Sequence, residues 1–145
     1  MLKGKTAVIT GASRGIGAAV AVKLAARGAD IAVIYAGNVE AANQVCKECI
    51  EQYGVKAVAY KCNVADFSQV RETIAQIKKD FGTVHILINN AGITKDGLLA
   101  MMSEEAFDSV IDTNLKGAFN MIRHCTGMFI KNRQRSSQMQ GLTFL

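Results

Sequence analysis

The chain has 145 residues, half of them hydrophobic and a fifth charged, which predicts one globular domain with a core of its own. Its net charge of +5 arises mostly from basic residues spread among acids, without interleaved aromatics or a nucleic-acid motif, so no nucleic-acid partner is expected. No apolar run reaches the roughly 18 uncharged residues of a membrane span. We expect neither a span nor a signal peptide, and the predicted location is the cytoplasm.

Short apolar runs alternate with helical patterns along the chain. Such alternation is typical of βαβ units and predicts an α/β fold with a doubly wound, Rossmann-type parallel sheet. The sheet is expected to be incomplete, with about four strands and flanking helices. The predicted strands are residues 6–10, 31–35, 57–61 and 84–89, and the predicted helices are residues 16–27, 40–53, 66–81 and 103–132.

Residues that cap or stop helices stand at the predicted boundaries. Asn38, Asp66 and Ser103 belong to the types that accept a hydrogen bond from the first turn of a helix. Gln69 follows Asp66 at the capping-box position. Glycine stops three of the helices, at Gly28, Gly54 and Gly82.

The pattern is lost after about Lys131. Residues 132–140 are polar and without periodicity, and only the short stretch 141–145 follows. A doubly wound sheet should have a fifth buried strand here, and the sequence predicts none. We therefore divide the chain into a Rossmann-type α/β domain, residues 1–131, and a divergent tail, residues 132–145.

The stretch TGASRGIG at residues 10–17 lies between the first strand and an alanine-rich helix. Glycines at such a junction allow a tight turn, a close approach of backbone N–H groups to a pyrophosphate, and close packing of the helix on the strand. The helix N-terminus adds unpaired N–H donors and the positive end of a dipole. The stretch predicts a phosphate cradle; the alternative is a turn that only ends the strand.

The spacing of the three glycines, G-x-x-x-G-x-G at residues 11–17, resembles the cofactor motif of the short-chain dehydrogenase/reductase family. Three further matches come in the family's order. Asn-Val at residues 63–64 follows the third strand, where the family usually has Asp-Val. Asn-Asn-Ala-Gly at residues 89–92 follows the fourth strand, and Asn114 matches an active-site asparagine. The resemblance covers residues 3–131.

Within the family, the chain looks most like the 3-oxoacyl-acyl-carrier-protein reductases, which use NADPH to reduce a 3-oxoacyl thioester. The resemblance implies NADP as cofactor, a substrate carried on an acyl-carrier protein, and a homo-oligomer. Asn114 would hold a water of the proton relay, although a helix asparagine is more often a packing or surface residue. The predicted cofactor-binding residues are Gly11, Ser13, Arg14, Gly15, Ile16, Gly17, Asn38, Asn63, Val64, Asn90, Ala91 and Gly92.

The end of the second strand favours NADP over NAD. An NAD site places an acid there to hold the ribose hydroxyls. Here the strand ends Tyr-Ala-Gly-Asn at residues 35–38, and Asp30 lies at its opposite end. Arg14 can pair with the 2′-phosphate of NADP through its planar guanidinium. The alternative for Arg14 is a solvated loop charge.

The family's proton donors are not found in the 145 residues. The family uses a serine after the fifth strand and a tyrosine with a lysine four residues later. Tyr35, Tyr53 and Tyr60 are each followed four residues later by valine or alanine. Ser136 and Ser137 lack the preceding Ile- and Val-rich strand, so neither is assigned as catalytic. The chain alone is expected to be inactive.

Three functional hypotheses follow. The first is the family's reduction of a 3-oxoacyl group, and the second is a catalytically inactive fragment that binds a dinucleotide. The third is self-association, through the last helix or through strand 84–89, which would be an unpaired edge of the sheet.

The four cysteines do not predict a metal site or a disulfide framework. Cys46 and Cys49 lie on one face of a predicted helix, and Cys62 and Cys125 do not complete a ligand spacing. All four are predicted to be buried thiols, and no metal is expected.

Overall fold

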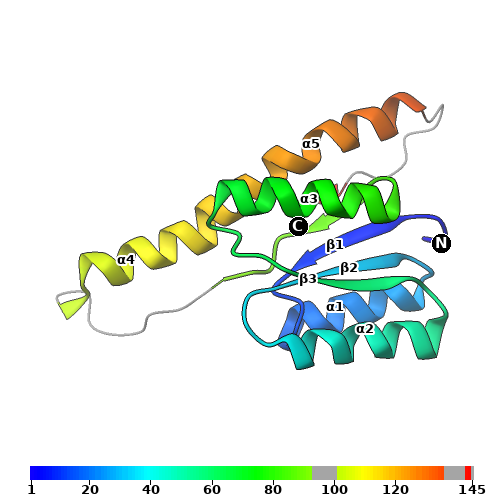
Figure 1. Ribbon diagram of the computed structural model, residues 1–145, viewed down its shortest axis with the longest axis horizontal. Helices are drawn as coiled ribbons and strands as arrows, with labels where there is room; N and C mark the ends of the chain where they lie inside the picture. The colour runs from blue at the N-terminus through cyan, green and yellow to red at the C-terminus, as the bar shows by residue number, and fades with distance from the viewer. Residues whose placement is uncertain (93–100, 136–142, 145) are drawn as a thin grey trace.

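The computed structural model describes residues 1–92, 101–135 and 143–144 and places a parallel sheet between two layers of helices (Figure 1). The strands are β1 (Thr6–Thr10), β2 (Asp30–Tyr35), β3 (Ala57–Lys61), β4 (Ile86–Ile88) and β5 (Thr143–Phe144). The helices are α1 (Gly15–Ala26), α2 (Val39–Tyr53), α3 (Phe67–Phe81), α4 (Glu104–Ile111), the π-helical η2 (Asp112–Lys116) and α5 (Gly117–Arg135).

The strand order β3-β2-β1-β4-β5 makes this the predicted Rossmann-type sheet. The chain passes from β1 outward to β2 and β3, and then crosses to the other side of β1 to form β4. All pairs are parallel. Ligands of such sheets bind beyond the carboxyl ends of the strands, where the direction of winding changes. In this chain that place lies at the ends of β1 and β4.

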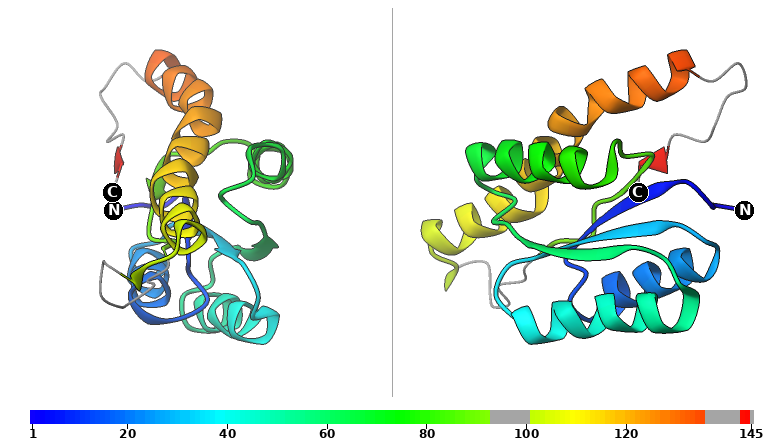
Figure 2. Two further views of the ribbon diagram at one scale, coloured as in Figure 1. Left: turned by 90° about the vertical axis from the view of Figure 1, so that its left-hand side faces the viewer. Right: turned by 45° about the vertical axis from the view of Figure 1, so that its right-hand side comes forward.

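Alternation along each strand divides the core into two layers. On β1, Ala7 and Ile9 face the layer of α1 and α2, whereas Val8 packs in the layer of α3 and α5. On β4, Leu87 lies on the same side as Val8. Figure 2 shows the two helix layers on opposite faces of the sheet. The buried strand β1, with apolar residues at positions 7–9, therefore contributes to both layers of the core.

The fourth strand is shorter than the predicted residues 84–89 because a side chain replaces part of its ladder. The N–H of Thr6 donates to Nδ1 of His85 at 3.0 Å, and the N–H of His85 donates to the Thr6 carbonyl at 2.9 Å. Only a neutral ring can accept at Nδ1. Burial, followed by the charge of Lys5, lowers the pKa of His85 and favours that neutral form. Strands β1 and β3 have the predicted bounds.

The tail adds a strand of two residues, β5, that the sequence did not predict. Thr143 pairs with Ile86, and Phe144 pairs with Leu87, in parallel register. A β-branched and an aromatic residue favour the extended conformation. Strand β4 is therefore not the unpaired edge that the sequence predicted, at least along Ile86 and Leu87.

The last helical region is divided into three pieces. Helix α4 has no buried residue and projects from the body of the molecule (Figure 1). The π-helical turn η2 separates it from α5, which continues to Arg135, past the predicted end at about Asn132. The basic side chains of Arg133 and Arg135 favour that last turn because they face the negative end of the helix dipole. None of the described helices is long and apolar enough to cross a membrane.

Candidate functional site

The glycine-rich turn between β1 and α1 has the conformation that its glycines allow. Gly11 and Gly15 have φ angles of 61° and 59°, a region that residues with a Cβ rarely adopt. A Cβ at Gly17 would lie 2.6 Å from Nδ2 of Asn90 and closer still to the carbonyl oxygen of Gly11. The third glycine is therefore required by packing rather than by conformation.

The N-terminus of α1 has no side-chain cap. Its N-cap residue, Arg14, makes no capping hydrogen bond, and the first turn contains no acidic residue. In contrast, Asn38, Asp66 and Ser103 cap α2, α3 and α4 through their side chains, as predicted. The first N–H groups and the positive dipole end of α1 are thus not neutralised by a cap, as an anion site at a helix N-terminus requires.

The hydroxyl of Thr10 joins the carboxyl ends of β1 and β4. It accepts hydrogen bonds from the N–H groups of Asn90 and Ala91, both at 2.9 Å, and donates to the Ile88 carbonyl at 3.5 Å. The side chain of Asn90 donates to the Gly11 carbonyl at 3.2 Å. These bonds hold the glycine-rich turn against the Asn-Asn-Ala-Gly turn. Sequence reasoning assigned Thr10 no such role, although a hydroxyl at the last strand residue was the available signal.

A cleft of about 590 Å³ opens at this edge of the sheet. It brings together the turn after β1, the end of β2, the end of β3 and the turn after β4. Of the predicted cofactor-binding residues, the cleft is lined by Gly11, Ser13, Arg14, Gly15, Asn38, Asn63, Val64, Asn90, Ala91 and Gly92. It is also lined by residues that were not among the predicted cofactor-binding residues, namely Ile34, Tyr35, Ala36, Gly37, Cys62 and Thr113.

Three predicted site residues do not line the cleft. The side chain of Ile16 is 75% exposed, and Gly17 is buried beneath the turn. Asn114 lies in the π-helical turn η2. A Cβ at Gly92 would lie 3.2 Å from Oδ1 of Asn114, so this side chain stands directly beside the Asn-Asn-Ala-Gly turn. Single π-helical turns inside helices often occur at functional sites.

The charges around the cleft agree with the prediction, made from the end of β2, that the cleft favours NADP over NAD. Among the described lining residues there is no aspartate or glutamate, and Arg14 is the charged one. Asp30 lies at the far end of β2, where its Oδ1 accepts the N–H of Lys56 at 2.9 Å. The carboxylate therefore stabilises the β2–β3 connection and is remote from the site.

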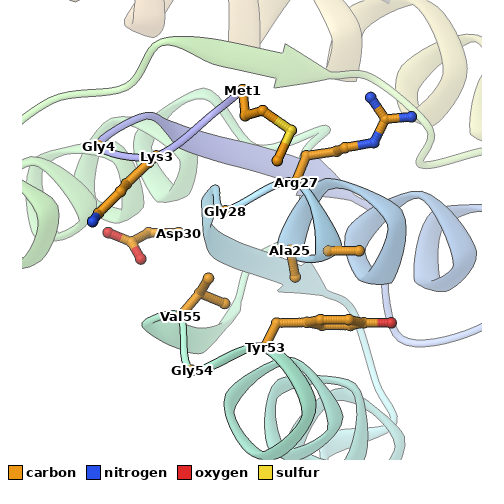
Figure 3. Close-up of a pocket in the computed structure, with 11 residues that line it drawn as sticks. Met1, Lys3, Gly4, Ala25, Arg27, Gly28, Asp30, Tyr53, Gly54 and Val55 are labelled. Carbon is orange, nitrogen blue, oxygen red and sulfur yellow. The ribbon is translucent and has the colours of Figure 1, made fainter.

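A second cleft, of about 600 Å³, lies at the opposite edge of the sheet (Figure 3). Because the two volumes are nearly equal, chemistry and not size distinguishes them. The second cleft is lined by the last residues of α1 and α2 and by Lys3, Arg27 and Asp30. The carboxyl ends of helices disfavour anions. A pyrophosphate is therefore better accommodated in the first cleft.

The tyrosines do not form a proton relay. Tyr35 lines the first cleft, Tyr53 lines the second, and the hydroxyl of Tyr60 donates to Oδ2 of Asp80 at 2.6 Å. Ser136 and Ser137 lie outside the described residues. No described tyrosine is followed four residues later by a lysine.

The four cysteines are buried and unbridged. Burial, followed by the charge of Cys49, raises the pKa of Cys46 to about 11. Burial also raises the pKa of Cys125. These thiols stay protonated near neutral pH, whereas metal binding needs the thiolate. Within the described part of the chain, no cluster of histidine, cysteine and acidic residues could hold a metal ion.

Comparison with known families identifies the fold's relatives. The model of the short chain dehydrogenase family matches residues 5–137. The chain belongs to this family. A 3-oxoacyl-[acyl-carrier-protein] reductase FabG of Staphylococcus epidermidis is 48% identical to it over 139 residues, which are 96% of this chain and 56% of that protein. The chain thus spans about half the length of this curated relative.

Solved structures that include a short chain dehydrogenase share the architecture. One from Burkholderia cenocepacia, in complex with NADP, has a TM-score of 0.84 and 36% identity, over 88% of this chain and 51% of that one. An NAD+-bound xylitol dehydrogenase has a TM-score of 0.86 and 31% identity, over 91% of this chain and 50% of that one. Both of these dinucleotide-bound proteins thus share the fold described here over about half of their length.

The close packing at Gly17 predicts a stability effect. Gly17→Ala should lower the free energy of unfolding by about 1–3 kcal/mol, because the added methyl group would meet the Gly11 carbonyl. Gly127→Ala is the matched control, since a Cβ there meets nothing within 4 Å. In the middle of α5 it should raise stability by about 0.5–1 kcal/mol. Urea unfolding of both variants checks this, and equal stability of Gly17→Ala and the unchanged chain would contradict it.

Proposed function

We propose that the cleft at the carboxyl ends of β1 and β4 binds NADP(H), and that the chain is the cofactor-binding half of a 3-oxoacyl-acyl-carrier-protein reductase. The observation that carries the proposal is the uncapped N-terminus of α1 behind the glycine-rich turn. The Thr10 hydroxyl fixes this turn against the Asn-Asn-Ala-Gly turn. The similarity to the staphylococcal reductase supports the substrate class.

Each part of the cleft suits one part of the nucleotide. The N–H groups at the start of α1 suit the pyrophosphate, and the exposed guanidinium of Arg14 suits the 2′-phosphate. By the family resemblance, Asn63 and Val64 would lie at the adenine, and the turn from Asn90 would lie at the ribose on the nicotinamide side. NADPH supplies the hydride when it is bound.

The 145 residues contain more of what nucleotide binding needs than of what catalysis needs. Reduction of a ketone also needs a proton donor and a group that polarises the carbonyl. Asn114 beside the cleft is the one active-site residue that the resemblance assigns here. We propose that this chain alone binds the nucleotide without reducing a 3-oxoacyl thioester.

The Arg14 assignment predicts a change in nucleotide preference. Arg14→Ala should weaken NADPH binding about tenfold or more and leave NADH binding nearly unchanged, because only NADPH has the 2′-phosphate. Titration of nucleotide fluorescence measures both affinities. In a separate assay, the unchanged chain should oxidise NADPH in the presence of an acetoacetyl thioester no faster than a sample without protein does. An equal loss for both nucleotides would contradict the role of Arg14. Oxidation above the background rate would contradict the inactivity of the chain.

A second candidate function, self-association, is supported by the face of α4, η2 and α5 that the sheet does not cover. We define the apolar stripe as Phe107, Ile111, Leu115, Phe119 and Ile122, which are spaced three or four residues apart and are all exposed. Leu115 is 66% exposed and Phe119 is 59% exposed. Contiguous exposed apolar surface of this kind marks interaction sites. We propose that two copies of the chain pack along the apolar stripe.

The stripe predicts a change of oligomeric state. The chain should sediment as a dimer at micromolar concentration, and the double variant Leu115→Glu/Phe119→Glu should sediment as a monomer, because the new charges cannot be buried. Ile50→Glu is the control, since Ile50 is an exposed apolar residue on α2 in the other helix layer. A monomeric unchanged chain, or equal dissociation by Ile50→Glu, would contradict the proposal.

A further inference from the structure

A fully buried amide, that of Asn120, lies where α5 meets the loop after β3. Asn120 is 0% exposed, and its Nδ2 donates to the carbonyl oxygen of Val64 at 2.8 Å. Its Oδ1 is buried and has no hydrogen-bond partner among the described residues. A buried acceptor without a partner is unfavourable, so the amide is not explained by core packing alone. The hydrogen bond from Asn120 to Val64 therefore indicates why an amide is present at this buried position.

The same helix contacts Val64 a second time. Gly117 lies three residues before Asn120, on the same side of α5. A Cβ at Gly117 would lie 2.6 Å from Cγ2 of Val64 and 3.2 Å from its Cβ. The helix backbone thus comes as close to the valine side chain as a glycine allows. Val64 is held by its carbonyl and by its side chain at once.

The N–H of Cys62, at the start of this loop, donates to the Tyr35 carbonyl at 3.0 Å, whereas the bonds made by Asn63 and Asp66 are local. The N–H of Asn63 donates to Oε1 of Gln69, and Oδ1 of Asn63 accepts the N–H of Ala65, both at 3.0 Å. The N–H of Asp66 donates to the Asn63 carbonyl, also at 3.0 Å. These bonds give the loop its shape and join it to α3. The bond from Asn120 joins it to α5.

Helix α5 follows directly on η2, which contains Thr113 and Asn114 at the other side of the cleft. Thr113 and Val64 both line the cleft. The contact between Asn120 and Val64 thus connects the wall next to Asn114 with the wall formed by the end of β3. A change in this contact would shift one wall relative to the other.

We propose that Asn120 is a positioning residue that fixes the Val64 wall of the cleft and thereby sets the affinity for the adenosine half of the nucleotide. Gly117 assists it by allowing Val64 to approach the helix. The inference rests on the proposed function, since it concerns the same cleft. Asn120 itself lines no part of the cleft and acts through Val64.

Asn132 provides a matched control on the same helix. Its Nδ2 donates to the Val84 carbonyl at 2.7 Å, and its Oδ1 accepts the hydroxyl of Thr83 at 2.9 Å. This amide also joins α5 to a backbone carbonyl of a neighbouring segment. The contact lies before β4, at the edge of the sheet opposite to the cleft. A merely structural role would be shared by both asparagines.

The test compares Asn120→Leu, Gly117→Ala and Asn132→Leu in the full chain, with NADPH and adenosine 2′,5′-bisphosphate as probes. Asn120→Leu should weaken both probes equally, by about fivefold, because the lost contact acts on the part that they share. Gly117→Ala should weaken both in the same way through the displaced Val64 side chain. Asn132→Leu should lower the urea midpoint without changing either affinity.

Each other result decides against the inference. The inference is overturned if Asn120→Leu is folded and binds both probes as tightly as the unchanged chain does. It is also overturned if Asn120→Leu loses affinity for NADPH alone, or if Asn132→Leu loses as much affinity as Asn120→Leu. If Asn120→Leu does not fold, Gly117→Ala decides by the same criteria. If the unchanged chain binds neither probe, the proposed function fails and the inference fails with it. If the unchanged chain binds both probes and the variants bind them with the same affinities, the inference fails while the proposed function stands.

Discussion

The site depends on the hydrogen bonds of one hydroxyl, that of Thr10, which joins the carboxyl ends of β1 and β4. These strands are adjacent in the sheet, although about 80 residues separate Thr10 from the two N–H groups that donate hydrogen bonds to its hydroxyl. The bonds bring the glycine-rich turn and the Asn-Asn-Ala-Gly turn into contact. The missing Cβ of Gly17 and the amide of Asn90 complete the same contact. Without the bonds of Thr10 and Asn90, the two turns would be related only through the pairing of β1 with β4 in the sheet.

The helices position the rest of the cleft by their ends. Helix α1 presents an uncapped N-terminus to it, whereas α2 begins with a turn capped by Asn38, which lines the cleft. Helix α5 contacts the end of β3 through Asn120 and follows the π-helical turn that contains Asn114. One long helix thus relates the adenine side, which the resemblance assigns to Val64, to the side of the active-site asparagine.

The sequence predicted the fold where local patterns determine it. The bounds of β1 and β3, the order of the elements and the caps at Asn38 and Asp66 follow from apolar runs and capping chemistry. It missed features that depend on distant residues: the ring of His85 that shortens β4, the strand β5, and the partners of Thr10 and Asn120. No periodicity specifies which carbonyl a buried amide meets. The cofactor roles of the lining residues remain predictions.

The central claim, that the nucleotide binds at the start of α1, is tested most directly by NMR titration of an isotope-labelled chain with NADP+. The account predicts that the largest shifts of backbone amide signals occur at residues 13–17, with further shifts at Asn63 and Val64. The cleft at the opposite edge provides an internal control through the amides of Lys3, Arg27 and Gly28. Shifts confined to those three amides, or none at saturating NADP+, would contradict the account.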